Sequence, residues 1–181
     1  MMVSLDGYFE GLNHDLSWHN VNDEFNKFAI AQLREADTIL FGRRTYQLME
    51  NYWPSKAAIQ DDPQVASLMN NTPKVVVSKT LEKVIETKNW KNITLITDNI
   101  KEEILKLKKQ KGKDIILLAS NNFSITLLKE GLLDEVRIMI NPVVLGKGTP
   151  LFYGIKDKLN FRLFNTKIFN SGNVLLYYIP I

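Results

Sequence analysis

The chain contains no cysteine among its 181 residues, and this absence removes several kinds of chemistry at once. Disulfide bonds, thiolate nucleophiles and cysteine-ligated zinc are all excluded. No stretch approaches the roughly 18 uninterrupted apolar residues of a transmembrane helix. Met1 leads directly into MMVSLDGY, without the basic segment and apolar core of a signal peptide. We therefore expect a cytoplasmic protein with no membrane partner.

The motifs of several large enzyme classes are missing as well. The chain has no Gly-x-Gly-x-x-Gly fingerprint for dinucleotides, no Gly-x-Ser-x-Gly nucleophile elbow and no Gly-x-x-x-x-Gly-Lys-Ser/Thr phosphate loop. His14 and His19 are five positions apart, and no acidic cluster joins them to complete a metal site. We expect both histidines to lie in a loop, and we expect no metal ion.

The net charge of +3, from 23 basic and 20 acidic residues, gives little support to a nucleic-acid partner. Much of the positive charge lies in KEEILKLKKQKGK, residues 101–113, where apolar residues alternate with lysines in the pattern of an amphipathic helix. No aromatic side chain stands between these lysines to stack on bases. The segment is therefore interpreted as a solvated helix face.

Apolar runs and helical patterns alternate along most of the chain. The length and the 45% apolar content suit one domain over residues 1–181. Strands are predicted at 38–41, 74–78, 93–97 and 114–119, and helices at 22–36, 44–52, 63–70, 100–110 and 122–131, the last closed by Gly131. Further on, only strands are predicted, at 135–145, 161–169 and 174–179, with a hairpin turn at 170–173.

This order of elements predicts an α/β fold built on one mixed, mostly parallel sheet with antiparallel strands at its C-terminal end. In open α/β sheets, ligands bind outside the carboxyl ends of the parallel strands. Three junctions at such ends carry small, hydroxyl or basic residues: 42–45, 78–80 and 119–122. Free amides and the positive end of a helix dipole would favour a phosphate there.

The junction TILFGRRTYQLM, residues 38–49, is the most informative of the three. Gly42 permits close approach of the backbone, and Arg43 or Arg44 can form a forked contact with a phosphate. Thr45 can cap the helix or bind a phosphate oxygen. A basic residue here would suit a 2′-phosphate, and hence NADP rather than NAD. An equally good alternative is that both arginines pair with surface carboxylates such as Glu50.

Four segments taken together resemble the dihydrofolate-reductase-like family, which includes the C-terminal reductase domain of bifunctional riboflavin-biosynthesis proteins. They are VSLDGYFEG, FGRRTYQLM…YWP, LLKEGLLDEVRIMINPVVLGKGTPLF and SGNVLLYY, and they occur in order along nearly the whole chain. The resemblance implies a three-layer fold, use of NADPH and a homodimer. It also implies reduction of a small heterocyclic substrate, as by dihydrofolate reductase or 5-amino-6-(5-phosphoribosylamino)uracil reductase.

The resemblance also assigns residues to the cofactor. It places the phosphates on the adenosine side near Gly42, Arg43, Arg44 and Thr45, with Ser78 and Lys79 beside them. Residues 4–18 would form a mobile loop over the nicotinamide, and the backbone of Val3 and Ser4 would bind its carboxamide. The candidate contacts of a flat substrate are aromatic: Trp18, Tyr52 and Trp53. Aromatic residues are more often part of the protein core.

Reduction of a C=N or C=O bond by hydride also needs an acid near the acceptor atom. Asp23 follows Trp18 by five residues, a spacing similar to that of the substrate carboxylate in dihydrofolate reductases. The alternative for Asp23 is capping of its helix together with Asn22 and Glu24. Asp6 is the second candidate, although an Asp-Gly pair is also typical of an ordinary turn.

Three features depart from the family pattern. Relatives carry paired glycines after the fifth predicted strand, where this chain has Ala119-Ser120, followed by Asn121 and Asn122 as possible anion contacts. The first strand is short, so that either it is truncated or the start codon lies upstream. The zinc deaminase domain of the bifunctional enzymes is absent. Two hypotheses therefore remain: an NADPH-dependent reductase, or a non-catalytic, dimeric nucleotide-binding relative.

Overall fold

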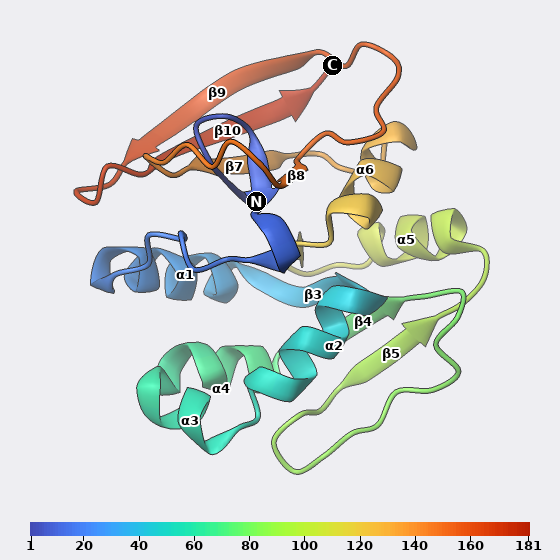
Figure 1. The fold of residues 1–181 in the computed structure, drawn as a ribbon. Helices are drawn as coiled ribbons and strands as arrows, with labels where there is room; N and C mark the ends of the chain where they lie inside the picture. Colours follow the sequence, from blue (N-terminus) through green and yellow to red (C-terminus); the bar gives the residue numbers. More distant parts are fainter. The chain divides into compact units, whose positions relative to one another are not determined.

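The computed structural model describes residues 1–181, which fold into two compact units. The parallel-sheet unit comprises residues 26–120, and the β-rich unit comprises residues 1–25 and 121–181. Both are drawn in Figure 1. The single domain expected from the length of the chain stays a prediction.

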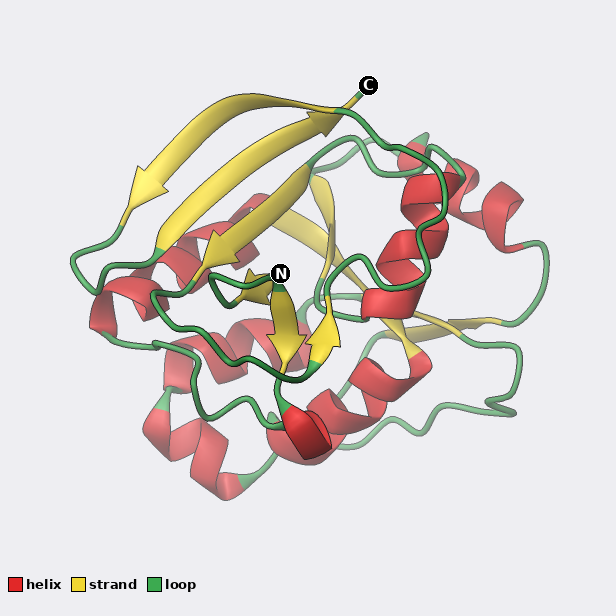
Figure 2. Ribbon diagram, turned by 45° about the horizontal axis from the view of Figure 1, so that its top comes forward, coloured by secondary structure: helices red, strands yellow, loops and turns green.

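The parallel-sheet unit contains a four-stranded sheet in the order β5-β4-β3-β6, with every neighbouring pair parallel. Figure 2 shows its helices in red and its strands in yellow. The strands are β3 (Ala36–Gly42), β4 (Lys74–Val77), β5 (Ile93–Ile96) and β6 (Asp114–Leu117). The helices are α2 (Arg43–Tyr52), α3 (Lys56–Asp61), α4 (Pro63–Asn71), α5 (Ile100–Lys108) and most of α1 (Asp23–Glu35).

Burial on both faces explains the apolar runs at 39–41 in β3 and 75–77 in β4. Ile39, Phe41 and Val76 are fully buried and belong to a core cluster that also includes Tyr46 of α2 and Trp90. Each crossover between these parallel strands passes through at least one helix or a long loop, as parallel pairing requires.

The β-rich unit holds a second sheet, in the order β1-β7-β10-β9, and the small ladder β2-β8. The four strands are β1 (Met2–Val3), β7 (Val136–Ile140), β9 (Phe161–Ile168) and β10 (Val174–Pro180). The ladder pairs β2 (Tyr8–Glu10) with β8 (Thr149–Pro150). A short 3-10 helix, η1 (Leu12–His14), and α6 (Asn121–Lys129) complete the unit.

The structure confirms the expected fold class, a parallel sheet with additional antiparallel strands. Gly131 closes α6 with a positive φ of 65°, and residues 170–173 form the expected hairpin turn between β9 and β10. Three details of the prediction were wrong. The strands form separate sheets rather than one, helix α3 was missed, and the strand predicted at 135–145 ends at Ile140.

No helix combines the length and the apolar character that crossing a membrane requires.

Candidate functional site

The three junctions predicted from the strand ends do lie at one edge of the parallel sheet. Gly42 at the end of β3 pairs with Val77 at the end of β4, so residues 78–80 emerge beside the start of α2. On the other side, Leu40 pairs with Leu117 of β6, and the Leu118 amide donates to the Leu40 carbonyl. Residues 119 and 120 follow immediately. The carboxyl edge of the sheet therefore gathers all three polar segments.

Helix α2 begins at this edge without a capping side chain. Gly42, its N-cap residue, is in an extended conformation (φ −80°, ψ 158°) and contributes no side-chain acceptor. Arg43 and Arg44 in the first turn are both exposed, and no ion pair joins either of them to Glu50. The first amides of a helix lack partners within the helix. The start of α2 thus offers amides and two uncompensated cations to an anion.

Ser120 ties this helix start to the junction after β6. Its hydroxyl accepts a hydrogen bond of 3.1 Å from the Gly42 amide and shares another of 2.9 Å with the Thr45 hydroxyl. Thr45 is buried, so its hydroxyl points into the protein rather than to solvent. Thr45 was expected to cap the helix or bind a phosphate oxygen. In the structure its hydroxyl joins two junctions instead.

Ala119 and Ser120 both adopt left-handed backbone conformations, with φ values of 51° and 65°. Glycine accepts such conformations readily, whereas residues with a Cβ rarely do. The chain therefore adopts at Ala119 and Ser120 the left-handed conformation that paired glycines would favour, although both residues carry a Cβ atom. Strain of this kind persists only where the surrounding structure enforces it, and it concentrates at functional sites.

The other residues predicted at this edge divide into one engaged and one free side chain. The Ser78 hydroxyl accepts hydrogen bonds from the amides of Thr80 (3.2 Å) and Leu81 (2.9 Å), so it shapes the turn after β4. Lys79 is exposed at the tip of that turn. Of these two side chains, only Lys79 is available to add charge at this edge.

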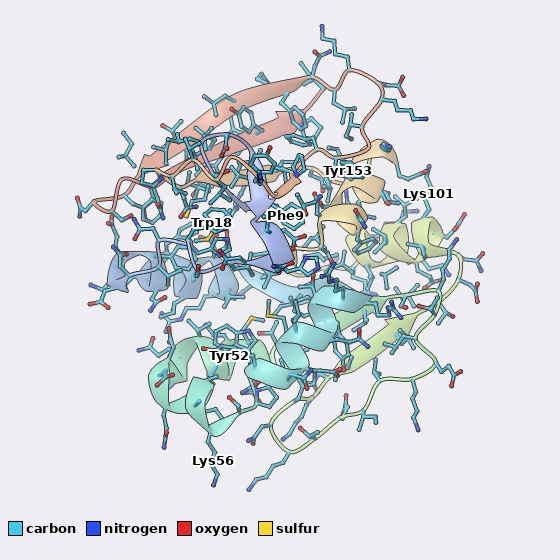
Figure 3. The ribbon with its side chains drawn as sticks, in the orientation of Figure 1. Phe9, Trp18, Tyr52, Lys56, Lys101 and Tyr153 are labelled. Carbon is cyan, nitrogen blue, oxygen red and sulfur yellow. The ribbon has the colours of Figure 1, made fainter.

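The two aromatic residues predicted to contact substrate lie at the far end of α2. A helix rises about 1.5 Å per residue, which puts Tyr52 some 13 Å along the axis from Arg43. Trp53 packs against the core cluster and donates its Nε1 hydrogen to the Met49 sulfur. The core alternative therefore describes Trp53. Tyr52 is 52% exposed, and Figure 3 shows it at the end of the helix.

A surface groove of about 410 Å³ lies elsewhere on the parallel-sheet unit. It is lined by Tyr46 and Glu50 of α2 and by residues 81–85. None of the residues predicted to bind the cofactor lines it. The groove and the candidate phosphate site are therefore separate features of this unit.

In the β-rich unit, Asp6 serves a turn. Its carboxylate accepts hydrogen bonds from the amides of Leu145 (3.1 Å) and Gly146 (2.7 Å). A hydrogen bond from the Ser4 side chain, followed by those amides, lowers the pKa of Asp6 to about 2. Ser4 itself is buried, and its hydroxyl accepts the Tyr8 amide at 3.0 Å. Since Asp6 is ionised at neutral pH, it is poorly suited to donate a proton.

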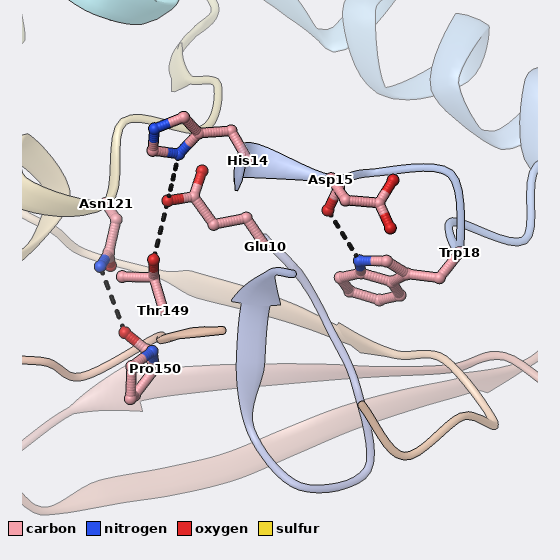
Figure 4. A network of polar contacts seen from close by, with 7 residues as sticks. All are labelled: Glu10, His14, Asp15, Trp18, Asn121, Thr149 and Pro150. Atoms are coloured by element: carbon pink, nitrogen blue, oxygen red, sulfur yellow. Dashed lines mark hydrogen bonds and ion pairs between the residues drawn. The ribbon is translucent and has the colours of Figure 1, made fainter. Parts of the chain in front are cut away.

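Asp23 and Trp18 occupy the segment that leads into α1. Asn22 caps the helix by accepting the Phe25 amide at 3.0 Å, whereas Asp23 is exposed and forms no hydrogen bond. The residue that caps this helix is therefore Asn22 and not Asp23. Trp18 is half-buried and donates its Nε1 hydrogen to the Asp15 carbonyl at 3.0 Å (Figures 3 and 4).

A cluster that sequence analysis missed surrounds Glu10 (Figure 4). One oxygen of its carboxylate lies 2.9 Å from His14 Nδ1 and accepts a hydrogen bond of 2.8 Å from the Thr149 hydroxyl. Glu10 is buried, whereas the His14 side chain is 59% exposed. The i, i+4 spacing of Glu10 and His14 was a usable signal. The glycine at position 11 makes residues 10–14 resemble an ordinary loop, so this spacing does not stand out in the sequence.

Asn121 and Asn122, the first residues of α6, were expected to contact an anion. Asn121 is buried and donates from Nδ2 to the Pro150 carbonyl at 3.4 Å, while its Oδ1 has no hydrogen-bond partner. Asn122 is exposed. The side chain of Asn121 thus faces its own unit, and only Asn122 remains free.

These observations fit the phosphate groups of a dinucleotide at the carboxyl edge of the parallel sheet. Uncapped amides at the start of α2, together with Arg43, Arg44 and Lys79, supply the donors and positive charge that phosphates need. The Ser120 hydroxyl engages the Gly42 amide and the Thr45 hydroxyl but none of these three cations.

Comparison with known proteins agrees with this fold. The model of the RibD C-terminal domain family matches residues 1–175. The protein YyaP of Bacillus subtilis (strain 168) is 36% identical over 98% of this chain and 91% of its own length. A second protein of that strain, YwjB, is 26% identical over 98% of this chain and 93% of its own length.

Solved structures show the same architecture. A riboflavin biosynthesis protein described as putative, from Shewanella sp. PV-4, superposes with a TM-score of 0.74 at 23% identity, over 100% of this chain and 96% of its own. A Thermotoga maritima deaminase/5-amino-6-(5-phosphoribosylamino)uracil reductase gives 0.71 at 18% identity; 99% of this chain corresponds to 55% of that one. Dihydrofolate reductase from Enterococcus faecalis, complexed with NADP(H), gives 0.61 at 12% identity, with coverages of 99% and 92%.

Proposed function

This chain belongs to the RibD C-terminal domain family, and we propose that it is an NADPH-dependent reductase of a small heterocyclic substrate. The activity would be similar to that of 5-amino-6-(5-phosphoribosylamino)uracil reductase or dihydrofolate reductase. Both kinds of enzyme occur among the proteins that share its fold. The chain corresponds to 55% of the length of that bifunctional deaminase/reductase.

The observation that carries this proposal is the start of α2. Two exposed arginines without ion-pair partners stand on the first turn of an uncapped helix, at the carboxyl edge of a parallel sheet. Exposed arginines do not need partners for stability, but their placement beside free amides is typical of phosphate recognition. Arg43 and Arg44 would bind the cofactor's phosphates, including the 2′-phosphate that distinguishes NADPH from NADH.

When bound, NADPH supplies a hydride. The protein's own residues must then hold the phosphates, exclude water and provide a proton to the acceptor atom. The first amides of α2 would orient the phosphates, and Ser120, which accepts the hydrogen bond of the Gly42 amide, holds the start of that helix in place.

Titration of the protein with NADPH and with NADH, followed by quenching of protein fluorescence and by thermal shift, tests the proposal. We expect a larger shift with NADPH, and loss of that preference in the double variant Arg43→Ala, Arg44→Ala. Lys56→Ala, an exposed lysine on α3, is the matched control and should bind NADPH as the wild type does. Absence of any shift at millimolar NADPH would contradict the proposal.

A second candidate function is a non-catalytic, dimeric nucleotide-binding protein, which the Ala119-Ser120 sequence favours. The Ser120 hydroxyl already occupies the Gly42 amide and the Thr45 hydroxyl, two groups that would otherwise be free for a ligand. Assays of NADPH oxidation with 5-amino-6-(5-phosphoribosylamino)uracil and with dihydrofolate separate the candidates. Binding of NADPH without turnover of either compound would favour the second.

We also propose that the protein is a cytoplasmic homodimer. Strand β9 is at the edge of its sheet and exposes large apolar side chains, of which Ile168 is 76% and Leu163 46% exposed. An edge strand with exposed apolar side chains is suited to contact with a second copy of the chain. Sedimentation velocity should give the mass of a dimer for the wild type and of a monomer for Ile168→Lys. A wild-type monomer at micromolar concentration would contradict the proposal.

A further inference from the structure

The groove beside α2 takes no part in the function proposed above, yet its lining has the features of a ligand site. We propose that it binds a small organic cation with an apolar body, such as a primary amine, whose ammonium contacts Tyr46 and Glu50. All of the lining residues belong to the parallel-sheet unit, and none of them belongs to the candidate phosphate site. The inference therefore does not depend on the binding of NADPH.

Tyr46 forms the floor of the groove and ends in a polar atom without a partner. Only 1% of this residue is exposed, and its hydroxyl oxygen, Oη, is buried with no hydrogen bond. Burial, and after it the neighbouring Glu50 side chain, raises the pKa of Tyr46 to about 12. The hydroxyl end of Tyr46 therefore adjoins Glu50, the other α2 residue that lines the groove. Native proteins rarely leave a buried hydroxyl unpaired, because its desolvation is costly.

Helix α2 and the core hold this pair of side chains in place. Tyr46 and Glu50 are four residues apart, so they lie on the same face of the helix. The Tyr46 ring packs between aromatic neighbours, with its centre 6.5 Å from that of Phe41 and 6.2 Å from that of Trp90. Glu50 is half-buried and forms no ion pair. The floor is thus rigid, and the carboxylate beside it is free to meet a cation.

The walls of the groove are mostly apolar. They come from residues 81–85, in the loop that follows β4, of which Leu81, Val84 and Ile85 have hydrocarbon side chains. Ile85 is 63% exposed. The volume of about 410 Å³ falls within the range of roughly 300–1,000 Å³ that small-molecule sites occupy. A ligand with an apolar body would cover these side chains.

The charges around the groove select the sign of the ligand. Glu50 and Glu82 line it with two carboxylates, against the single ammonium of Lys83. The charge of Glu86 also acts on the Tyr46 phenol and adds to the negative side. An anionic ligand would be repelled here, and a wholly apolar one would leave the Tyr46 hydroxyl unpaired. A cation is therefore the class that satisfies both features.

An ammonium group has the donors that the floor requires. It carries three N–H donors and no acceptor, so one can reach Tyr46 Oη while another reaches the Glu50 carboxylate. Hydrogen bonds in which both partners are charged are stronger than neutral ones. We therefore expect Glu50 to contribute to affinity through its charge and Tyr46 through one hydrogen bond.

The test follows binding of benzylammonium to the full-length protein by proton–nitrogen correlation NMR. The indole N–H signal of Trp90 is the reporter, because this ring lies beside Tyr46, and that of Trp18, in the β-rich unit, is the reference. We expect the Trp90 signal to shift saturably, with a dissociation constant of about 1 mM, and the Trp18 signal to stay in place. Benzyl alcohol, of the same size but neutral, should bind at least about tenfold more weakly.

Two variants test the proposed contacts. Tyr46→Phe removes only the unpaired hydroxyl, so it should fold and should raise the dissociation constant for benzylammonium about tenfold. Glu50→Gln, at a half-buried position, should raise it by at least as much. Tyr153→Phe is the matched control, because it removes an exposed hydroxyl in the other unit and should bind benzylammonium as the wild type does.

Three outcomes would overturn the inference. They are the lack of a saturable Trp90 shift with benzylammonium, equal affinity for benzyl alcohol, and wild-type affinity for benzylammonium in either Tyr46→Phe or Glu50→Gln. A protein that binds benzylammonium but no NADPH would contradict the proposed function alone. A protein that binds NADPH but no benzylammonium would contradict this inference alone.

Discussion

The parallel-sheet unit has cationic side chains at both ends of its strands. One of them at the amino end is buried and hydrogen-bonded, whereas two at the carboxyl end are exposed. Lys74 begins β4 at the amino end and is fully buried. Its ammonium donates to the carbonyls of Asn70, Thr72 and Lys91 at 2.8–3.0 Å and lies 4.4 Å from the centre of the Trp90 ring. At the carboxyl end, Arg43 and Arg44 are exposed and have no ion-pair partner.

This difference in burial and hydrogen bonding identifies Lys74 as a structural cation and the two arginines as cations available to a ligand. A buried ammonium is tolerated only when its hydrogen bonds are complete, and Lys74 finds all three acceptors in its own chain. The arginines have donors to spare in a region where the protein supplies no acceptor. Their donors are therefore available to an external anion, and a phosphate has the charge and geometry that suit a guanidinium group.

The largest expected effect is on the free energy of unfolding, when the hydrogen bonds of buried Lys74 are removed. Lys74→Met keeps the side-chain length but leaves three carbonyls without their donor, which should destabilise the protein by about 3 kcal/mol at roughly 1 kcal/mol for each lost hydrogen bond. Urea unfolding measures this. Lys79→Met, at an exposed position after the same strand, should change the unfolding free energy by less than about 0.5 kcal/mol. A loss below 1 kcal/mol in Lys74→Met would show that Lys74 is not structural.

A conservative change of the two arginines at the carboxyl end should leave the stability of the protein unchanged and weaken the binding of NADPH. The double variant Arg43→Lys, Arg44→Lys keeps both charges but loses the planar fork that matches a phosphate. We expect its dissociation constant for NADPH to rise about tenfold, which corresponds to about 1.4 kcal/mol. Its urea unfolding curve should overlay that of the wild type. Unchanged affinity measured by fluorescence quenching would mean that the arginines act only through net charge.

The buried lysine also predicts how stability depends on pH. Burial lowers the pKa of Lys74 to about 8 in the folded protein, below its ordinary value of 10.5. Between these values the unfolded chain binds more protons than the folded one, so this group makes stability rise with pH, by at most about 1.4 kcal/mol per unit. The stability difference between wild type and Lys74→Met should therefore widen from pH 8 to pH 10. A constant difference would contradict the lowered pKa.

The smallest expected effect concerns the strained junction after β6. Ala119→Gly relieves a left-handed alanine, worth about 1–2 kcal/mol, and loses about 0.5–1 kcal/mol through the greater freedom of glycine when unfolded. We expect a net gain in unfolding free energy between about 0 and about 1.5 kcal/mol, centred below about 1 kcal/mol. Gly131→Ala, which places a Cβ at a φ of 65°, should show the opposite sign in the same thermal unfolding experiment.

Much of the fold and the first half of the candidate site followed from sequence patterns. The apolar runs of β3 and β4 marked buried parallel strands, and Gly131 marked the end of α6, because these signals are local. The rule that ligands lie at the carboxyl ends of parallel strands also predicts that Gly42, Ser78 and Ser120 gather at one edge of the sheet.

The partners of the acidic residues could not be predicted in this way. The motifs predict Asp6 and Asp23 as candidate acids, but after the hydrogen bond with the nearby Ser4 side chain, the pKa of Asp6 is lowered by amides of residues 145 and 146, far along the chain. Glu10 and His14 are close in sequence, yet their burial and orientation depend on Thr149 and on the glycine before it. Which polar groups form hydrogen bonds with one another depends on contacts between segments that are far apart in the sequence.

By itself, the sequence determined the α/β class, the order of helices and strands, and the placement of glycine, arginine and hydroxyl residues at strand ends, because periodicity and turn chemistry act over a few residues. Tertiary structure alone decided which strands share a sheet, that Ser120 closes onto Gly42, and that Glu10 is buried against His14. Those outcomes depend on desolvation and on hydrogen bonds between segments that only folding brings together.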